Sequence, residues 1–309
     1  MEKLAKCKNV TGTYRNDNII LGGPHVIEFK TSDNRFSITI EQFGYRKITI
    51  KALEDISIFE LYGELSKIER LLMIFDGQFI NLESLDFTDS SDTEENTLKS
   101  SSINLMNQRL TYFKSADMVS YKSDKLLEFD EVLNAEVYEK WKQLLEELDI
   151  AHQIYLYAMG DTKMPVDVKC AFLTELAEPL VEVLKVYTEL FSDLNPGERG
   201  TNLRKCLEAL IEEYGIDIFE KEIKTNKDKF LSVMIDSRVR IMHIKRNRKN
   251  LYFNGNESVL YILKLSLLYR KILLDIIGVE KQIYTDKLQK CVSRLNGWND
   301  TLDKLLLKL

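Results

Sequence analysis

The sequence predicts an α+β protein in which a small β-rich domain precedes an all-α helical bundle. Before about residue 113, short runs alternate apolar and polar residues, as strands do. After residue 136, apolar residues recur at helical spacing, and Pro is present at positions 165, 179 and 196. We therefore expect three parts: an N-terminal domain over 1–113, a connector over 114–135 and a helical bundle over 136–309.

A two-stranded hairpin is the clearest element of the N-terminal domain. The runs RFSITIEQF (35–43) and YRKITIKAL (45–53) alternate apolar and polar residues on either side of Gly44. This is the pattern of two paired strands joined by a tight turn. The segment VIEF (26–29) is expected to form a strand that precedes the hairpin.

A helix and two further strands are expected to complete this domain. Over 58–75 the apolar residues recur at helical spacing, so one face of this helix can pack on the sheet. The segments 79–87 and 103–113 are strand candidates. They flank the polar run TDSSDTEENTLKSSS (88–102), whose single apolar residue is Leu98. We expect this run to be an exposed loop.

Helical spacing continues through the rest of the chain. Pro179 lies inside the second predicted helix and is expected to kink it. The segment SDLNPGERG (192–200) predicts a break between helices. The predicted helices cover residues 136–159, 168–192, 200–214, 225–247, 256–278 and 281–295.

Composition and charge exclude several classes of protein. The formal net charge is -6, so any affinity for nucleic acid must come from a local cationic patch. The start MEKLAKCKNV lacks the apolar core of a signal peptide, and the apolar run 258–279 contains four charged residues. We therefore expect a cytoplasmic protein without a membrane span. The four cysteines lie far apart with no CxxC spacing, so we expect reduced thiols and neither a metal nor a cofactor.

The predicted helix 225–247 contains the residues best suited to chemistry. Its apolar residues form one inward stripe, and Arg238 lies on or beside that stripe. A guanidinium there keeps its charge and needs a carboxylate or a ligand phosphate as acceptor. His243 follows five residues later, about 140° around an ideal helix. The two side chains therefore share no narrow face, although they can converge on a ligand or in a cleft between two copies of the helix.

An Arg and a His can cleave RNA without a metal. RNA supplies its own nucleophile, the ribose 2′-OH, and an imidazole can remove the proton from it near neutral pH. A guanidinium can hold the scissile phosphate and stabilise the charge that develops on it. The expected products are a 2′,3′-cyclic phosphate and a 5′-OH.

A cluster of cations beside His243 strengthens this hypothesis. Lys245, Arg246, Arg248 and Lys249 follow it with no acidic residue before Glu257, which suits a phosphate backbone. Arg240 is a further candidate for RNA contact. Tyr252 and Phe253 come next and can stack on unpaired bases.

These features also have a structural explanation. One Arg-x4-His is unsurprising in a chain with many arginines, and the spacing alone favours a core-edge Arg238 paired with a carboxylate. In that case His243 is a helix-end residue satisfied by a carbonyl, and the cations that follow it are solvated at the helix C-terminus. The other two histidines are weaker candidates for function: His152 lies in an apolar helical run, and His25 sits at a turn with no acidic or His neighbour at ligand spacing.

The segment RVRIMH (238–243) resembles the motif of the HEPN superfamily, an Arg and a His separated by four to six residues on one helix of a small bundle. TNLRKCLEALIEEYG precedes it, and SVLYILKLSLLYRKILLDIIGV follows it, like the long apolar helix of ApeA-type HEPN proteins. This likeness covers about residues 136–295. The segment FSITIEQFGYRKITIKALEDISIFELYGELSKIERLLMIFDG is similar to the β-rich domain that precedes HEPN in ApeA-like phage-defence proteins.

The resemblance implies a metal-independent endoribonuclease that acts in phage defence or as a toxin. It implies that Arg238 and His243 are catalytic and that the active site forms where two HEPN domains meet in a homodimer. A phage-derived trigger or regulatory partner would act through the N-terminal domain. Many members have a polar residue directly after the Arg, where this chain has Val239. Some members without the full motif bind nucleotides or partners without cutting, so a non-catalytic nucleotide-, RNA- or partner-binding module is the alternative.

Overall fold

The computed structural model describes residues 5–15, 25–108, 125–148, 150–160, 163–196, 202–244 and 250–309. The chain divides into two compact units, an N-terminal unit over residues 1–143 and a C-terminal unit over residues 144–309. The division falls inside helix α4 (Ala135–Leu148). Residues 114–124 of the predicted connector lie outside the described residues.

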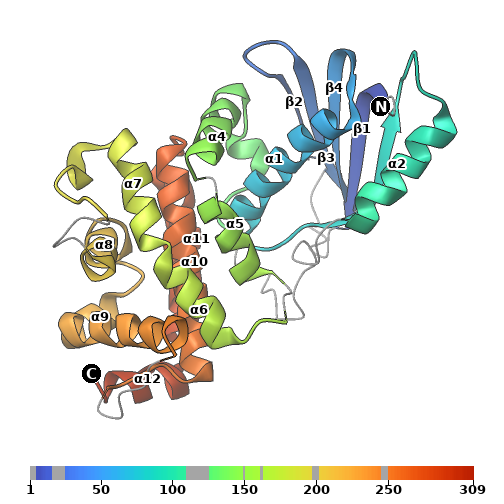
Figure 1. Cartoon of the computed structure of the whole chain (residues 1–309). Helices are drawn as coiled ribbons and strands as arrows, with labels where there is room; N and C mark the ends of the chain where they lie inside the picture. Colours follow the sequence, from blue (N-terminus) through green and yellow to red (C-terminus); the bar gives the residue numbers. More distant parts are fainter. Residues whose placement is uncertain are drawn as a thin grey trace. The chain divides into compact units, whose positions relative to one another are not determined.

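The N-terminal unit is built on a five-stranded antiparallel sheet with the strand order β2-β3-β4-β1-β5 (Figure 1). Together with the helices that follow, this sheet confirms the predicted α+β class. The strands are β1 (Lys6–Arg15), β2 (His25–Lys30), β3 (Phe36–Phe43), β4 (Tyr45–Ser57) and β5 (Asn81–Thr88). The helices of this unit are α1 (Ile58–Asp76), α2 (Glu95–Gln108), α3 (Phe129–Val132) and the first part of α4.

The predicted hairpin is confirmed as β3 and β4, which turn at Gly44 with φ 72°. This left-handed conformation is open to glycine without a steric penalty. The inward residues of both strands are buried, and helix α1 packs on strands β1 and β4 with its own apolar face. A buried ion pair fixes this packing, because Arg46 Nη1 donates to Asp76 Oδ2 at 2.6 Å.

Two parts of the N-terminal unit differ from the prediction. Strand β1, between β4 and β5, was not predicted, because Gly12 interrupts its inward apolar residues. The strand predicted over 103–113 is wrong as far as residue 108, since helix α2 covers 95–108 and also takes up much of the predicted loop 88–102. Leu98, Ser102 and Leu105 lie one helical turn apart and bury one face of α2, which packs on β5.

The C-terminal unit is a bundle around the long apolar helix α10. This helix packs against α5, α6, α11 and α12, and most of its residues are buried (Figure 1). Its N-terminus carries a capping box, in which Asn254 and Glu257 satisfy each other's backbone N–H groups. The remaining helices are α5 (Ile150–Met159), α6 (Val166–Glu175), α7 (Ala177–Tyr187), the 3-10 turn η3 (Glu189–Phe191), α8 (Leu203–Leu210), the π-helical turn η4 (Ile211–Gly215), α9 (Glu220–Met242), α10 (Gly255–Ile276), α11 (Lys281–Asn296) and α12 (Asn299–Leu306).

The helix boundaries depart from the predicted ones where local signals were weak. The helix predicted over 168–192 breaks at Leu176, between α6 and α7, and Pro179 lies in the first turn of α7. A Pro is tolerated there because the first N–H groups of a helix have no acceptor within it. Helix α9 begins at Glu220, contains non-helical backbone at Asn226 and ends at Met242 rather than at 247. No helix among the described residues is long and apolar enough to span a bilayer.

A buried charged pair joins α9 to α10. Lys264 Nζ lies 2.5 Å from Glu222 Oε1, and neither side chain is exposed to solvent. The hydroxyl of Tyr261 donates to the same carboxylate oxygen at 3.0 Å. Burial lowers the pKa of Lys264, and the negative charge of Glu222 opposes that shift. The carboxylate is therefore the counter-charge that keeps an ammonium group in the core.

Replacing this carboxylate should destabilise the bundle. We expect Glu222→Gln to lower the free energy of unfolding by about 3–5 kcal/mol near neutral pH, because it leaves Lys264 buried without its counter-ion. The loss should shrink as the pH rises toward 10.5, the ordinary pKa of a Lys, since the unfolded chain then gives up its proton as well. Urea denaturation at several pH values measures both effects.

The matched control is Glu220→Gln, which removes an exposed ion pair with Lys224 on the same helix. We expect this substitution to change the free energy of unfolding by less than about 1 kcal/mol. Equal losses in the two variants would contradict a special role for the buried pair.

Candidate functional site

Helix α9 brings Arg238 to the edge of the helical core. Phe230, Val233 and Met234 on α9 are buried, and the helix packs against α6. The side chain of Arg238 is 17% exposed and faces Glu175, the last residue of α6. Arg238 Nη2 donates to Glu175 Oε1 at 2.6 Å, and Arg238 Nε donates to the other carboxylate oxygen. The guanidinium is therefore held along one side by two parallel hydrogen bonds.

The end of α9 places His243 beside Arg238. The helix stops at Met242, and the backbone N–H of His243 closes the last turn on the carbonyl of Val239 at 3.0 Å. Ile244 then has φ 51°, in the left-handed region. His243 Nε2 lies 3.3 Å from Arg238 Nη1. Because residues 238–242 are helical, this contact is made by the far ends of the two side chains across the angle of about 140°.

The contact limits the roles of the imidazole nitrogens. A guanidinium has only donors, so in this hydrogen bond Nε2 is the acceptor, which requires the tautomer with the proton on Nδ1. His243 is exposed to solvent, whereas Arg238 is largely covered. The N–H of Arg238 occupies the lone pair of Nε2, so Nε2 could accept another proton once a bound anion drew that N–H away. An imidazole and a fixed positive charge are the elements needed to take a proton close to an anion.

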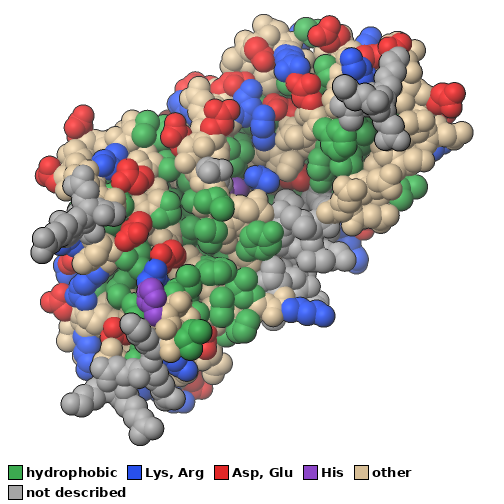
Figure 2. Space-filling model, in the orientation of Figure 1, with side chains coloured by type: hydrophobic (Ala, Val, Ile, Leu, Met, Phe, Trp, Pro, Cys, Tyr) green, Lys and Arg blue, Asp and Glu red, His purple; other side chains and the backbone are tan. Residues whose placement is uncertain are grey.

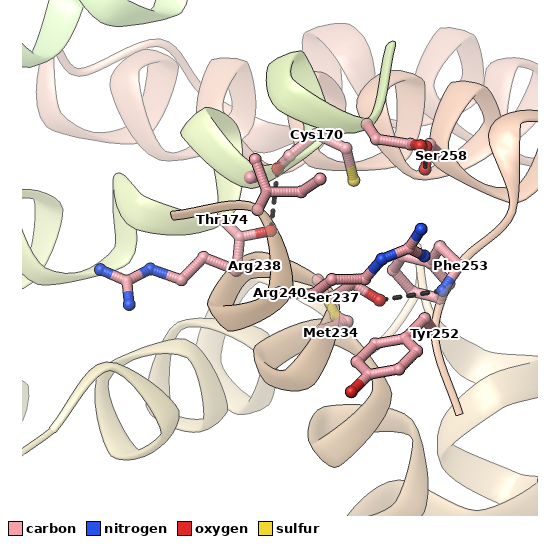
Figure 3. Close-up of a pocket in the computed structure, with 12 residues that line it drawn as sticks. Cys170, Thr174, Met234, Ser237, Arg238, Arg240, Tyr252, Phe253 and Ser258 are labelled. Atoms are coloured by element: carbon pink, nitrogen blue, oxygen red, sulfur yellow. Dashed lines mark hydrogen bonds between the residues drawn. The ribbon is translucent and has the colours of Figure 1, made fainter. Parts of the chain in front are cut away.

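A small pocket lies on the other side of α9 from this contact. Figure 3 shows the side chain of Arg238 pointing away from the pocket, whereas Arg240 points into it toward Phe253 and Ser258. The guanidinium of Arg240 lies over the ring of Tyr252, 5.3 Å from its centre. The pocket is lined by Asp167, Cys170, Ala171, Thr174, Met234, Ser237, Arg238, Arg240, Ile241, Tyr252, Phe253 and Ser258.

The two aromatic residues after the cationic segment have different environments. Phe253 is buried and stacks on Tyr261 with the ring centres 4.3 Å apart. Its backbone N–H donates to Ser237 Oγ at 2.9 Å, which ties the chain before α10 to α9. The suggestion that Phe253 stacks on bases is therefore wrong. Tyr252 is partly exposed and keeps one face of its ring beside Arg240.

The structure brings together some of the predicted site residues. Arg238 and His243 are in contact, and Arg240 lies on the same helix with its side chain in the opposite direction (Figure 3). Lys245, Arg246, Arg248 and Lys249 lie outside the described residues. On the face shown in Figure 2, Lys and Arg side chains are intermingled with Asp and Glu. On this face, the positive side chains that could bind a polyanion therefore lie beside negative ones.

Glu175 is the site residue that the sequence analysis missed. It lies 63 positions before Arg238 and in no motif with it, so only the packing of α6 on α9 reveals the pair. The structural alternative of an Arg238–carboxylate pair is thus present in the fold. The second half of that alternative differs, since the imidazole of His243 is exposed and faces the guanidinium.

The other two histidines make contacts that stabilise the fold. His152 is fully buried, and its Nδ1 lies 2.9 Å from the hydroxyl of Tyr269, in agreement with the predicted core position. His25 pairs through Nδ1 with Asp130 in the N-terminal unit. Among the described residues, no group of three or more His, Cys, Asp or Glu side chains is placed to hold a metal ion.

Comparison with known proteins identifies the helical region. Residues 182–283 match the family model described as Apea-like HEPN, a segment that runs from α7 into α11 and includes Arg238 and His243. Glu175 lies just before the matched segment. Searches of curated proteins and of solved structures gave no significant match. The family match confirms, over these residues, the resemblance to ApeA-like HEPN proteins noted in the sequence.

Proposed function

We propose that this protein is a metal-independent HEPN endoribonuclease that cleaves single-stranded or loop RNA with Arg238 and His243. The observation that carries the proposal is the contact between Arg238 Nη1 and His243 Nε2 at a solvent-exposed imidazole. An imidazole and a permanent cation this close together would suit the binding of one phosphodiester. The Apea-like HEPN match over the same residues supports this assignment.

Cleavage would proceed by attack of the ribose 2′-OH on the adjacent phosphorus. The phosphate would take over the Nη1 N–H that Arg238 directs at His243, which frees Nε2 to accept the 2′-OH proton. Arg238 would then stabilise the negative charge that gathers on the phosphate oxygens. The bond from phosphorus to the 5′-oxygen then breaks, and the leaving oxygen takes a proton from solvent or from a second imidazole. The products are a 2′,3′-cyclic phosphate and a 5′-OH.

The surroundings of the pair suit an unpaired RNA strand. Arg240 and Tyr252 offer a cation and a partly exposed ring side by side, beside which a splayed base could stack. The segment with Lys245, Arg246, Arg248 and Lys249 would contact the backbone. Loops such as a tRNA anticodon are therefore plausible substrates. A homodimer through the HEPN region, activated by a phage-derived trigger in antiphage defence or acting as a toxin, is the setting we propose.

A non-catalytic binding module is the second candidate. It is favoured by the ion pair of Arg238 with Glu175, because a guanidinium already satisfied by a carboxylate has fewer donors to offer a phosphate. Val239, in place of the polar residue that many HEPN nucleases carry, also favours it. In that case the cations around α9 would hold RNA, a nucleotide or a partner without cutting.

Cleavage in the absence of metal separates the two candidates. We expect the purified protein, with its trigger where one is needed, to cut total RNA in EDTA and to leave 2′,3′-cyclic phosphate ends. His243→Ala should lower the rate by about 10²–10⁴-fold, because it removes the proton acceptor. Sequencing of RNA ends after cyclic-phosphate-specific ligation measures both the rate and the end chemistry.

His25→Ala is the matched control, since it removes a histidine that pairs with Asp130 in the other unit. We expect this variant to cut as the wild type does, and circular dichroism should give the same helix content for all three proteins. RNA binding without cleavage under every trigger tried, or full activity of His243→Ala, would rule out the nuclease.

Arg240 should contribute to RNA affinity and not to the chemical step. In a His243→Ala background, which prevents cutting, we expect Arg240→Ala to weaken binding of unpaired RNA uniformly across sequences. The slope of the logarithm of affinity against the logarithm of salt concentration should fall by about one phosphate contact. Fluorescence anisotropy over a salt series measures it.

Lys224→Ala is the control for that measurement, because it removes a cation near the opposite end of α9. Equal weakening by the Lys224 and Arg240 substitutions would mean that general charge, and not the Arg240–Tyr252 surface, sets the affinity.

A further inference from the structure

We infer that Glu175 is a positioning residue, which orients the guanidinium of Arg238 and thereby favours the tautomer of His243 that carries its proton on Nδ1. The catalytic part of this inference rests on the proposed nuclease function, whereas the effect on the imidazole does not. The observation behind it is a continuous chain of hydrogen bonds from Glu175 through Arg238 to His243.

The carboxylate of Glu175 binds one side of the Arg238 guanidinium and leaves N–H groups on the other side unbound by it. An Arg has five N–H groups, and Glu175 accepts from Nε and from one N–H of Nη2. Nη1 then faces His243 with one of its N–H groups. The second N–H of Nη1 and the remaining one of Nη2 are not used by Glu175, so they are available to a phosphate. The ion pair therefore orients the guanidinium and still leaves two of its N–H groups for a phosphate.

The fold holds Glu175 rigidly for this purpose. Leu173, Thr174 and Leu176 on either side of it are buried, and Thr174 Oγ1 donates to the carbonyl of Cys170 at 3.0 Å. Glu175 is the last residue of α6 and directly precedes the N-cap of α7, so the dipoles of the two helices act on its charge in opposite directions. Local helix preference therefore does not account for a Glu at this position, and its partner across the α6–α9 contact does.

The positioning also affects which ring nitrogen of His243 carries the proton. Without a fixed donor, the proton of a neutral imidazole can reside on either nitrogen. With Arg238 held by Glu175, Nη1 lies beside Nε2, and a hydrogen bond from this donor favours the tautomer with the proton on Nδ1. A change at Glu175 should therefore alter the imidazole, although Glu175 makes no hydrogen bond to His243.

Nitrogen-15 NMR of the histidine rings in the full chain tests this without any RNA. The chain has only three histidines, so His243→Ala assigns the signal. We expect wild type to show the Nδ1–H form with Nε2 unprotonated, and Glu175→Gln to increase the Nε2–H form. Glu175→Asp keeps the charge on a side chain that is shorter by one methylene. Its fraction of the Nε2–H form should lie between those of the other two proteins. Glu178→Gln, a nearby carboxylate without a hydrogen bond to Arg238, is the matched control and should leave the signal unchanged.

Single-turnover cleavage of a short unpaired RNA tests the catalytic consequence. We expect Glu175→Gln to lower kcat by about 10²-fold, as a misplaced catalytic group does, with little change in KM. Adding Arg238→Lys to Glu175→Gln should cause little further loss beyond that of Arg238→Lys alone, because the two act through one path.

The outcomes are distinguishable. An unchanged histidine spectrum in a folded Glu175→Gln protein would overturn the inference. Faster cleavage by Glu175→Gln would also overturn it, since Glu175 would then be a competitor of the phosphate. Absence of cleavage in wild type, with the expected tautomer shift present, would remove the proposed nuclease and leave the positioning of His243 established.

Discussion

A guanidinium cannot give up its charge, and this constraint organises the candidate site. Arg238 lies at the edge of the core with most of its side chain covered, so it needs an acceptor from a neighbouring element. Glu175 at the end of α6 supplies that acceptor, and the packing of α6 on α9 brings the two together. The orientation of the guanidinium, and through it the contact with His243, follows from this one pair.

The second constraint is the reach of the Arg238 side chain. On a helix, side chains five residues apart lie on different faces. His243 directly follows the last residue of α9, so the two groups meet only through the far ends of their side chains. The deeper pair of Lys264 with Glu222 differs, because both groups are fully enclosed and leave nothing for a ligand. The Arg238–Glu175 pair is partly exposed and can contact a ligand, whereas the Lys264–Glu222 pair can only stabilise the core.

Much of the fold follows from local patterns in the sequence. The β3–β4 hairpin, α1 and α10 were predicted because their apolar residues recur at strand or helix spacing and because Gly44 or polar caps mark their ends. Strand β1 and helix α2 were missed or misassigned, because a strand with a central Gly12 and a helix with few apolar residues give weak periodic signals.

The site was predictable only in part. The presence of Arg238 and His243 on one segment is visible in the sequence, and so is the resemblance to HEPN proteins. The direct contact between them was not predicted, because it depends on the conformations that the two side chains adopt. Glu175 carries no signal at all in a single sequence, because its partner is 63 positions away and is reached only through tertiary packing.

Ile244 gives the site a property that its polar residues lack. Its side chain is 93% exposed, next to the imidazole of His243 and in a backbone conformation that β-branched residues rarely adopt. Burying such a side chain is favourable by about 1.5–3 kcal/mol. A surface that covers Ile244 would therefore gain apolar contact at the residue directly after His243. If the same surface also covered the imidazole and guanidinium, the lower dielectric would strengthen their attraction for a phosphate.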